Sequence, residues 1–477
     1  MTFLTQLFQL LLTPAGLAGL VGGLILVLQA RRSARLAWLL VSVGCFTASL
    51  AKFCDAFIVE PPALAFPLQQ LREMGRPLTI ALLGLLLLVA VLRPAAHRRS
   101  WLPRPLLFLM LVQAAIFFKT VLFGSVLFAF LAASTFGAVV AVIILGPSRW
   151  LGDDRDFVLA AQTIAGVGLI FVAANGYQAL IDLHPITFVH GLLLGTTGNP
   201  QHAATLLAAT IPAFIFLYEQ PAGRGWRRRL WLAGLALVIG ALVMTGSRTG
   251  LLMAAITVLL FYRRRIGLLL RIGLPVAIAL WALVIVFDQS SLVGDLSLTS
   301  ATGKILSETN TRQDVWAVLW RNFLQYPFFG VPLRGDRLFG YGESSWLGAA
   351  AAVGLAGFIP LLLFGLTSLQ MLIRLYRISR RSHRLFLQTS LVISGLASLL
   401  AGSFFEAYLL GNLTFSLMAL LLYLVLGHYI ITVSQHHTAP SETPVRPTPA
   451  PWAAARANGL RPSYRTQPTN ARLKPSR

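Results

Sequence analysis

The chain has 477 residues, of which 56% are apolar and only 12% are charged, and its formal net charge is +23. A soluble domain carries roughly 25% charged residues, so this composition excludes an ordinary soluble protein. Apolar runs of roughly 18 to 22 residues recur along the chain, and each is long enough to cross a hydrocarbon core about 30 Å thick. We therefore predict an all-α fold, a polytopic transmembrane helical bundle.

The apolar segments predict about thirteen spans, with about ten in residues 1–287 and about three in residues 345–433. Between these groups we expect a large extracytoplasmic loop, residues 288–344, and after them a tail, residues 434–477. The expected spans cover residues 9–29, 37–57, 77–93, 105–119, 121–146, 157–177, 202–218, 230–247, 249–262, 267–287, 345–373, 386–408 and 413–433.

Positive charge alternates between successive connecting loops. The positive-inside rule assigns the basic loops to the cytoplasm, which places the N-terminus outside and the C-terminal tail in the cytoplasm. The same rule explains the net charge without a nucleic-acid partner. The tail is rich in Pro, Ala, Thr, Ser and Arg, so we expect it to be disordered and to lie near anionic membrane lipid. The basic loops lie near residues 31–35, 93–104, 224–229, 263–265 and 374–384.

The first long outer loop, residues 178–201, contains His184 and His190 and ends in the sequence "GNPQ", which includes Asn199. Two histidines without carboxylates or cysteines at ligand spacing make a poor metal site, so we expect no metal here.

An isolated arginine interrupts the apolar sequence "VMTGSRTGLL", residues 243–252. The predicted topology places Arg248 at the outer end of a span. One interpretation is a boundary residue whose side chain extends to lipid headgroups, and the other is a binding site for a phosphate group.

Within the large outer loop, the sequence "TRQDVWAVLWRNFLQYPFFG" predicts a short amphipathic helix that ends before Pro327. Thr311 and Asp314 have the spacing of a capping box at its start. Arg312 then lies in the first turn, where a cation opposes the helix dipole unless an anion binds there. The expected apolar stripe consists of Val315, Leu319, Phe323 and Leu324, with Trp316 and Trp320 beside it.

These motifs, in this order, resemble the O-antigen ligase and O-antigen polymerase superfamily of bacterial envelope glycan assembly. The resemblance covers most of residues 100–430 and depends on the motifs "GNPQHAATLL" (198–207), "TGSRTGLL" (245–252), "TRQDVWAVLWRNFLQYPFFG" (311–330) and "GESSWLGAAAAVGLAG" (342–357). It implies an enzyme of the bacterial inner membrane that needs no metal and no cofactor. The implied donor is an undecaprenyl-diphosphate-linked oligosaccharide, and the implied acceptor is a hydroxyl of a glycan or lipid-linked glycan on the extracytoplasmic face.

The resemblance also implies roles for individual residues. Arg248 and Arg312 correspond to arginines that hold the diphosphate. Ligases that act on the lipid A core carry a His-Asn pair where this chain has Glu343 and Ser344, so the chain departs from the ligase pattern. The departure slightly favours a polymerase, with Glu343 as the general base.

Other residues have two interpretations each. Asn199, Trp316, Trp320 and Arg321 are candidate substrate-binding residues, but tryptophans at a membrane surface also anchor loops, and Arg321 could be solvated or contact lipid. Glu406 is the other acid near the outer end of a span. A transporter or flippase of envelope glycan or lipid is the alternative function, and a scaffold protein of the same machinery is a third. The charges at span ends, rather than at mid-depth, argue against a transporter.

Overall fold

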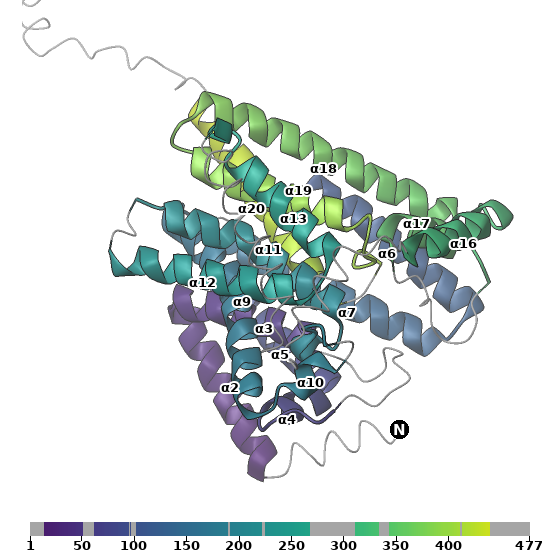
Figure 1. The fold of residues 1–477 in the computed structure, drawn as a ribbon, viewed down its shortest axis with the longest axis horizontal. Helices are drawn as coiled ribbons and strands as arrows, with labels where there is room; N and C mark the ends of the chain where they lie inside the picture. The colour runs from purple at the N-terminus through teal and green to yellow at the C-terminus, as the bar shows by residue number, and fades with distance from the viewer. Residues whose placement is uncertain are drawn as a thin grey trace, which may run out of the picture. The chain divides into compact units, whose positions relative to one another are not determined.

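The computed structural model describes residues 14–50, 62–94, 96, 102–188, 191–221, 225–267, 311–332, 343–410 and 413–438. These residues are mostly helical and contain no β-strand, which confirms the predicted all-α fold (Figure 1). The predicted span 267–287, most of the outer loop and nearly all of the tail lie outside the described residues. Residues 1–432 form one compact unit.

The helices follow the predicted apolar segments closely. In chain order they are α2 (Pro14–Arg32), α3 (Ala34–Ser49), α4 (Leu68–Glu73), α5 (Gly75–Leu92), α6 (Arg104–Phe123), α7 (Val126–Leu145), α8 (Pro147–Trp150), α9 (Asp154–Ile181), α10 (His184–Thr187), the 3-10 turn η1 (Gly195–Thr197), α11 (Pro200–Glu219), α12 (Trp226–Met244), α13 (Arg248–Phe261), α16 (Thr311–Gln325), α17 (Ser345–Val353), α18 (Leu355–Arg381), α19 (Phe386–Gly402) and α20 (Phe415–Thr438).

Six segments of the described chain are helical, long and apolar enough to cross a membrane: α6, α7 with α8, α9, α11, α18 and α20. Shorter apolar helices accompany them, including α3, α13 and α19. This is the architecture of a multi-pass membrane protein. The core lies around α11 and α20, most of whose residues are buried, whereas only about a quarter of the residues in the most apolar part of α6 and of α18 are buried. Tyr423 of α20 donates a hydrogen bond to the carbonyl oxygen of Ala209 in α11 (3.0 Å), which ties the two core helices together.

Three predicted spans differ from the structure. In the predicted span 37–57, helix α3 ends at Ser49, and residues 51–57 lie outside the described residues. The segment 345–373 was expected to be one helix, but it is divided at Gly354, whose φ is +64°. The backbone N–H of Leu355, just after the break, donates to the carbonyl oxygen of Pro327 (2.7 Å). The segment 386–408 was also expected to be one span, but α19 ends at Gly402. Apolar composition does not distinguish a continuous helix from a broken one, because both need apolar side chains to lie within a bilayer.

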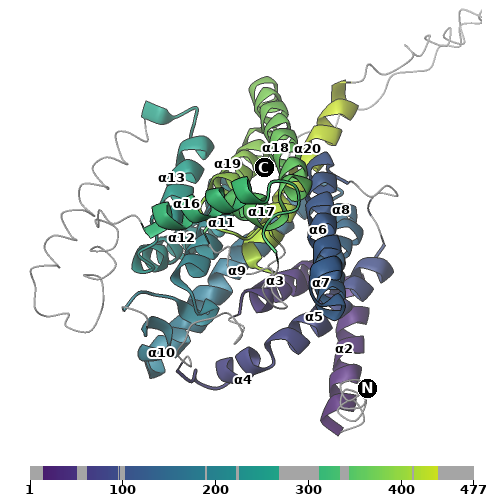
Figure 2. The same ribbon diagram turned by 90° about the vertical axis from the view of Figure 1, so that its right-hand side faces the viewer.

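Hydrogen bonds join loops that were predicted to share one side of the membrane. At the basic end, Tyr262 donates to Glu219 (2.9 Å), so the C-terminal ends of α11 and α13 lie together. At the opposite end, the first turns of α11 and α13 are bridged by Arg312 of α16. In both views α16 lies beside α17 at this second end (Figures 1 and 2).

Candidate functional site at the converging helix N-termini

The first turn of α11 is set by the sequence Gly-Asn-Pro. Gly198 adopts a positive φ of +66°, and Pro200 takes the first helical position, where its missing N–H is tolerated. Asn199 is the N-cap, and its side-chain oxygen accepts the N–H of Gln201 (2.8 Å). Asn199 was predicted to bind substrate, but in the structure its side chain caps the helix. The side chain of the next polar residue, Gln201, takes part in the site.

The first turn of α13 explains the break in the apolar sequence around Arg248. Gly246 adopts a φ of +61°, and Ser247 caps α13 by accepting the N–H of Gly250 (3.3 Å). Arg248 is therefore the first residue of the helix, and its side chain is exposed. Thr249 follows it and is buried. The arginine thus lies at the positive end of the helix dipole of α13, where a cation alone is unfavourable.

Helix α16 forms where the sequence predicted a short amphipathic helix, within residues 288–344. It contains Arg312 in its first turn and ends before Pro327, as predicted. Leu319 of the expected apolar stripe is buried, whereas Leu324 is 61% exposed. The helical rotation of about 100° per residue separates Leu324 from the face that contacts the protein.

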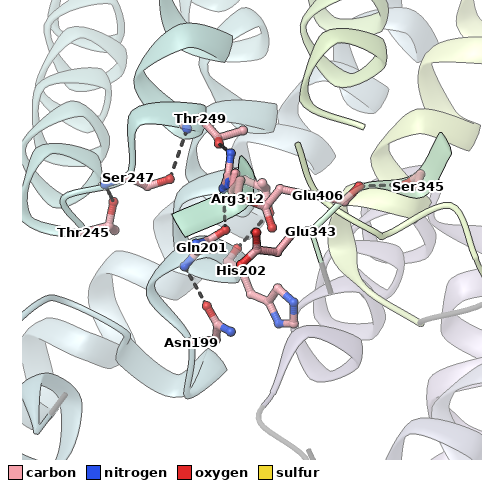
Figure 3. Close-up of polar contacts among 12 residues, drawn as sticks. Asn199, Gln201, His202, Thr245, Ser247, Thr249, Arg312, Glu343, Ser345 and Glu406 are labelled. Atoms are coloured by element: carbon pink, nitrogen blue, oxygen red, sulfur yellow. Dashed lines mark hydrogen bonds and ion pairs between the residues drawn. The ribbon is translucent and has the colours of Figure 1, made fainter. Parts of the chain in front are cut away.

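The guanidinium of Arg312 is the centre of the candidate site (Figure 3). Its Nη1 atom donates to Oγ1 of Thr249 (2.7 Å), and its Nη2 atom donates to Oε1 of Gln201 (2.8 Å). The Nη2 atom also forms an ion pair with Oε1 of Glu406 (2.7 Å). The Arg312 side chain is 18% exposed and the Glu406 side chain 5% exposed. One side chain of α16 therefore joins the first turns of α11 and α13 to the segment between α19 and α20.

Two aromatic rings, those of Phe405 and Trp316, lie on one side of the guanidinium. The Cζ atom of Arg312 lies 5.7 Å from the centroid of the Phe405 ring, within the range of a cation–π contact. Trp316, one turn further along α16, lies with its ring centroid 5.8 Å from that of Phe405. Its Nε1 atom donates to the backbone oxygen of Glu343 (3.3 Å). Trp316 therefore packs at the edge of the site, as expected for a residue that shapes it.

The start of α17 holds the segment that carries Glu406. Ser344 caps α17, and the hydroxyl of Ser345 donates to the backbone oxygen of Glu406 (2.7 Å). The Ser345 hydroxyl also accepts the N–H of Leu409 (3.2 Å). Burial, together with the nearby Glu406 carboxylate, raises the pKa of Tyr408 well above its ordinary value, so its phenol stays protonated and donates to the Leu399 oxygen. These bonds fix the backbone around Glu406.

Four helix N-termini therefore meet around one guanidinium, those of α11, α13, α16 and α17. Each helix N-terminus carries a partial positive charge equivalent to roughly +0.5. Together with Arg312 they favour an anion, and Glu406 is the anion that the protein itself supplies. The Nε hydrogen of Arg312 and one Nη1 hydrogen donate to no acceptor among the described residues. The arrangement can bind oxygens of an anionic ligand.

Glu343 lies in the turn just before α17 and is half-buried. Its Oε2 atom is buried and accepts no hydrogen bond from any residue that the structure describes. Figure 3 shows the side chain directed towards the group formed by Arg312, Gln201 and Glu406. A carboxylate oxygen without a donor can accept a proton or a hydroxyl hydrogen bond.

The structure brings Arg248 to the same end of the bundle as Arg312, because Arg248 directly precedes the Thr249 that binds Arg312. Neighbouring Cα atoms are about 3.8 Å apart. Two other predicted residues lie elsewhere: Arg321 is exposed on the far side of α16, and Trp320 is 49% exposed. Neither is brought into the group around Arg312.

The sequence analysis missed the roles of Gln201 and Thr249 and named Glu406 only as a further acid. Gln201 and Thr249 are each the second residue after a helix N-cap, and both lie inside the motifs quoted above. That position was the signal that could have found them, since side chains of a first turn lie beside the free N–H groups. In the part of the chain that the structure describes, no three His, Cys, Asp or Glu residues are grouped closely enough to hold a metal ion.

Comparison with known proteins gives no further identification. No protein-family model matches the chain, and no curated protein is significantly similar to it.

Proposed function

We propose that this protein is a glycosyltransferase of the bacterial inner membrane that uses an undecaprenyl-diphosphate-linked glycan as donor. The observation that carries the proposal is the largely buried guanidinium of Arg312 at the meeting point of four helix N-termini. A diphosphate is the part of such a donor that this arrangement suits, because guanidinium and free backbone N–H groups both bind phosphate oxygens. The resemblance to the O-antigen ligase and polymerase superfamily supports the same donor.

In the proposed reaction an acceptor hydroxyl oxygen attacks the anomeric carbon of the donor glycan. The bond between that carbon and the diphosphate oxygen breaks, and its electron pair stays on the leaving diphosphate. Negative charge therefore grows on the diphosphate, next to Arg312 and the positive ends of the helix dipoles. Because this charge is larger in the transition state, these groups stabilise the transition state more than the ground state. Arg248, at the start of α13, supplies the second cation.

The hydroxyl proton goes to Glu343 in this proposal. The Oε2 atom of Glu343, which accepts no hydrogen bond from the described part of the chain, supports the assignment, since a general base needs an available acceptor within reach of the hydroxyl. Because Glu343 stands where lipid A core ligases carry histidine, we favour polymerisation of glycan units over transfer to a lipid A core. The site then lies on the extracytoplasmic face, with the N-terminus outside and the tail in the cytoplasm.

A transporter or flippase is the second candidate, and the break between α17 and α18 favours it. Discontinuous helices of this kind often mark substrate sites in transporters. The two candidates differ in what they do to the donor, since a transporter moves the lipid-linked glycan without breaking its glycosyl bond.

The test is glycan transfer from an undecaprenyl-diphosphate donor by membranes that contain the full chain. Arg312→Ala and Arg248→Ala are each expected to lower the rate about a hundred- to a thousandfold, the usual effect of removing one charge-stabilising group. Arg321→Ala is the matched control, because Arg321 lies on α16 but faces away from the site. Full activity in both site variants, or translocation of the donor without a new glycosidic bond, would reject the proposal.

A further inference from the structure

Helix α16 presents three faces of different chemistry. One face contacts the protein and contains Arg312, Trp316 and Leu319, which are partly or fully buried. The remaining circumference is exposed, but its composition is not uniform. A helix that is exposed to water is normally polar around its whole exposed side. The distribution of apolar and polar side chains on the exposed side of α16 therefore indicates which medium each part of it contacts.

The exposed side consists of two stripes. Residues Gln313, Ala317, Trp320 and Leu324 have the spacing of one helix edge, and all but the first are apolar. Trp320 is 49% exposed and Leu324 is 61% exposed. Asp314, Val318, Arg321 and Gln325 form the other stripe, rotated by about 100° from the first; all four are exposed, and all but Val318 are polar.

The apolar stripe continues beyond the helix into exposed aromatic side chains. Phe328 is 67% exposed and Phe329 is 68% exposed, although both lie in a turn whose backbone is fixed. The Phe329 oxygen accepts a hydrogen bond from the buried Lys119 of α6 (2.7 Å). Phe118 and Leu122, on either side of Lys119 along α6, are 62% and 71% exposed. The aromatic turn therefore lies at the end of the outward apolar face of a membrane-spanning helix.

A second contact joins the apolar stripe to α18. The rings of Trp320 and Phe323 lie 5.5 Å apart, and those of Phe323 and Phe358 lie 5.9 Å apart. Phe358 lies in the first turn of α18, and the next residue, Ile359, is 49% exposed on that apolar span. The exposed apolar surfaces of α6 and α18 thus both continue onto α16.

We infer that α16 is an interfacial helix whose apolar stripe and following aromatic turn lie in the bilayer, with the stripe of Asp314, Arg321 and Gln325 in water. The partner is phospholipid at the membrane surface, where tryptophan and other amphipathic aromatic side chains are favourable. Charge in the polar stripe keeps the opposite edge hydrated. Arg312 is consequently held at the depth of the lipid headgroups. The inference depends on the membrane architecture and not on the proposed function.

Nitroxide scanning of the full-length chain tests the inference. Cysteine replaces Ala317, Trp320, Leu324, Arg321 or Gln325 one at a time in a chain whose Cys45 and Cys54 are changed to alanine. Each labelled variant is reconstituted into phosphatidylethanolamine–phosphatidylglycerol vesicles. Collision with oxygen, which partitions into lipid, is compared with collision with a water-soluble nickel chelate. The ratio is expected to be several-fold higher at positions 317, 320 and 324 than at positions 321 and 325.

Two results would overturn the inference. Equal ratios at all five positions would place the whole exposed side in one medium, water if they are low and lipid if they are high, and would contradict two stripes in different media. Protection of positions 317, 320 and 324 from both reagents would mean that another part of the chain covers the stripe. The Ala317→Cys variant changes a small residue, so it keeps the test valid if the loss of Trp320 or Leu324 disturbs folding, and a thermal melt against the cysteine-free parent checks each variant.

Discussion

The carboxylate of Glu406 lies 2.7 Å from Nη2 of Arg312, although the two residues are 94 positions apart in the chain. The pair joins helix α16 to the segment between α19 and α20. An ion pair in which both side chains are mostly buried depends on close geometry and further hydrogen bonds, and Thr249 and Gln201 supply those bonds on the arginine. Glu406 therefore directs the guanidinium while it also neutralises its charge.

Replacement of Glu406 is expected to separate these two effects. Glu406→Ala removes the partner of Arg312, so the guanidinium can turn away, and we expect the transfer rate to fall on the order of a hundredfold, as for other misplaced catalytic groups. Glu406→Gln keeps an oxygen that can accept from Nη2 and removes the charge, so its loss should be clearly smaller. Transfer rates of the two variants in membranes check the difference. Equal rates in the alanine and glutamine variants would contradict a directing role.

Thr249 is expected to matter through its hydroxyl alone. Thr249→Val keeps the shape of the side chain but removes the oxygen that accepts from Nη1 of Arg312. A hydrogen bond to a charged group contributes about 1.5–3 kcal/mol, so we expect a loss of roughly ten- to a hundredfold in transfer rate. Thr257→Val, further along α13, is the matched control, because its buried hydroxyl has no partner in the described chain. A rate for Thr249→Val equal to that of the control would show that the bond is not used.

Lys119 is expected to be a stability residue. Its Nζ atom donates to the backbone oxygens of Phe329 and Val331 (2.7 Å each) and to that of Ala352 near the end of α17. Lys119→Met leaves these carbonyl groups without their donor, and each buried unsatisfied group costs about 1–3 kcal/mol. We expect a clear fall in the thermal unfolding temperature in detergent. Phe118→Leu, one residue earlier on the exposed face, should leave that temperature nearly unchanged, and an equal effect of both substitutions would refute the assignment.

Gly354, at the break between α17 and α18, is expected to tolerate no side chain. Its φ is +64°, and a Cβ atom placed there would lie 2.5 Å from the backbone carbon of Phe328. Gly354→Ala should destabilise the fold by about 1–3 kcal/mol or more, since both the backbone conformation and the contact become unfavourable. Gly240→Ala in α12 is the control, because no heavy atom outside the helix's own backbone lies within 4 Å of a Cβ built there. Unfolding curves in which the two variants coincide would contradict this account.

The sequence analysis and the structure agree best where a local signal is strong. Two helix starts illustrate this. The break predicted between spans 230–247 and 249–262 lies where α13 begins at Arg248, and Arg312 lies in the first turn of α16 as predicted, although Thr311, the expected cap, is itself the first helical residue. The analysis was wrong about the continuous spans 345–373 and 386–408, because helix breaks there are stabilised by backbone bonds from distant segments. Among the tryptophans, Trp316 packs at the site, Trp320 is exposed, and Trp346 is buried with its Nε1 atom donating to Ser403 (2.9 Å).

The sequence by itself determined that this chain is a helical membrane protein, because length and apolarity alone decide whether a segment can cross a bilayer. It also singled out Arg248, an isolated charge in an apolar context, and Arg312, a cation in the first turn of a predicted amphipathic helix. Only the tertiary structure decided that Gln201, Thr249 and Glu406 surround Arg312. Side chains that are dozens of residues apart in the chain meet because their helices pack together. The residue pattern of one helix does not determine which other helix will place its first turn beside it.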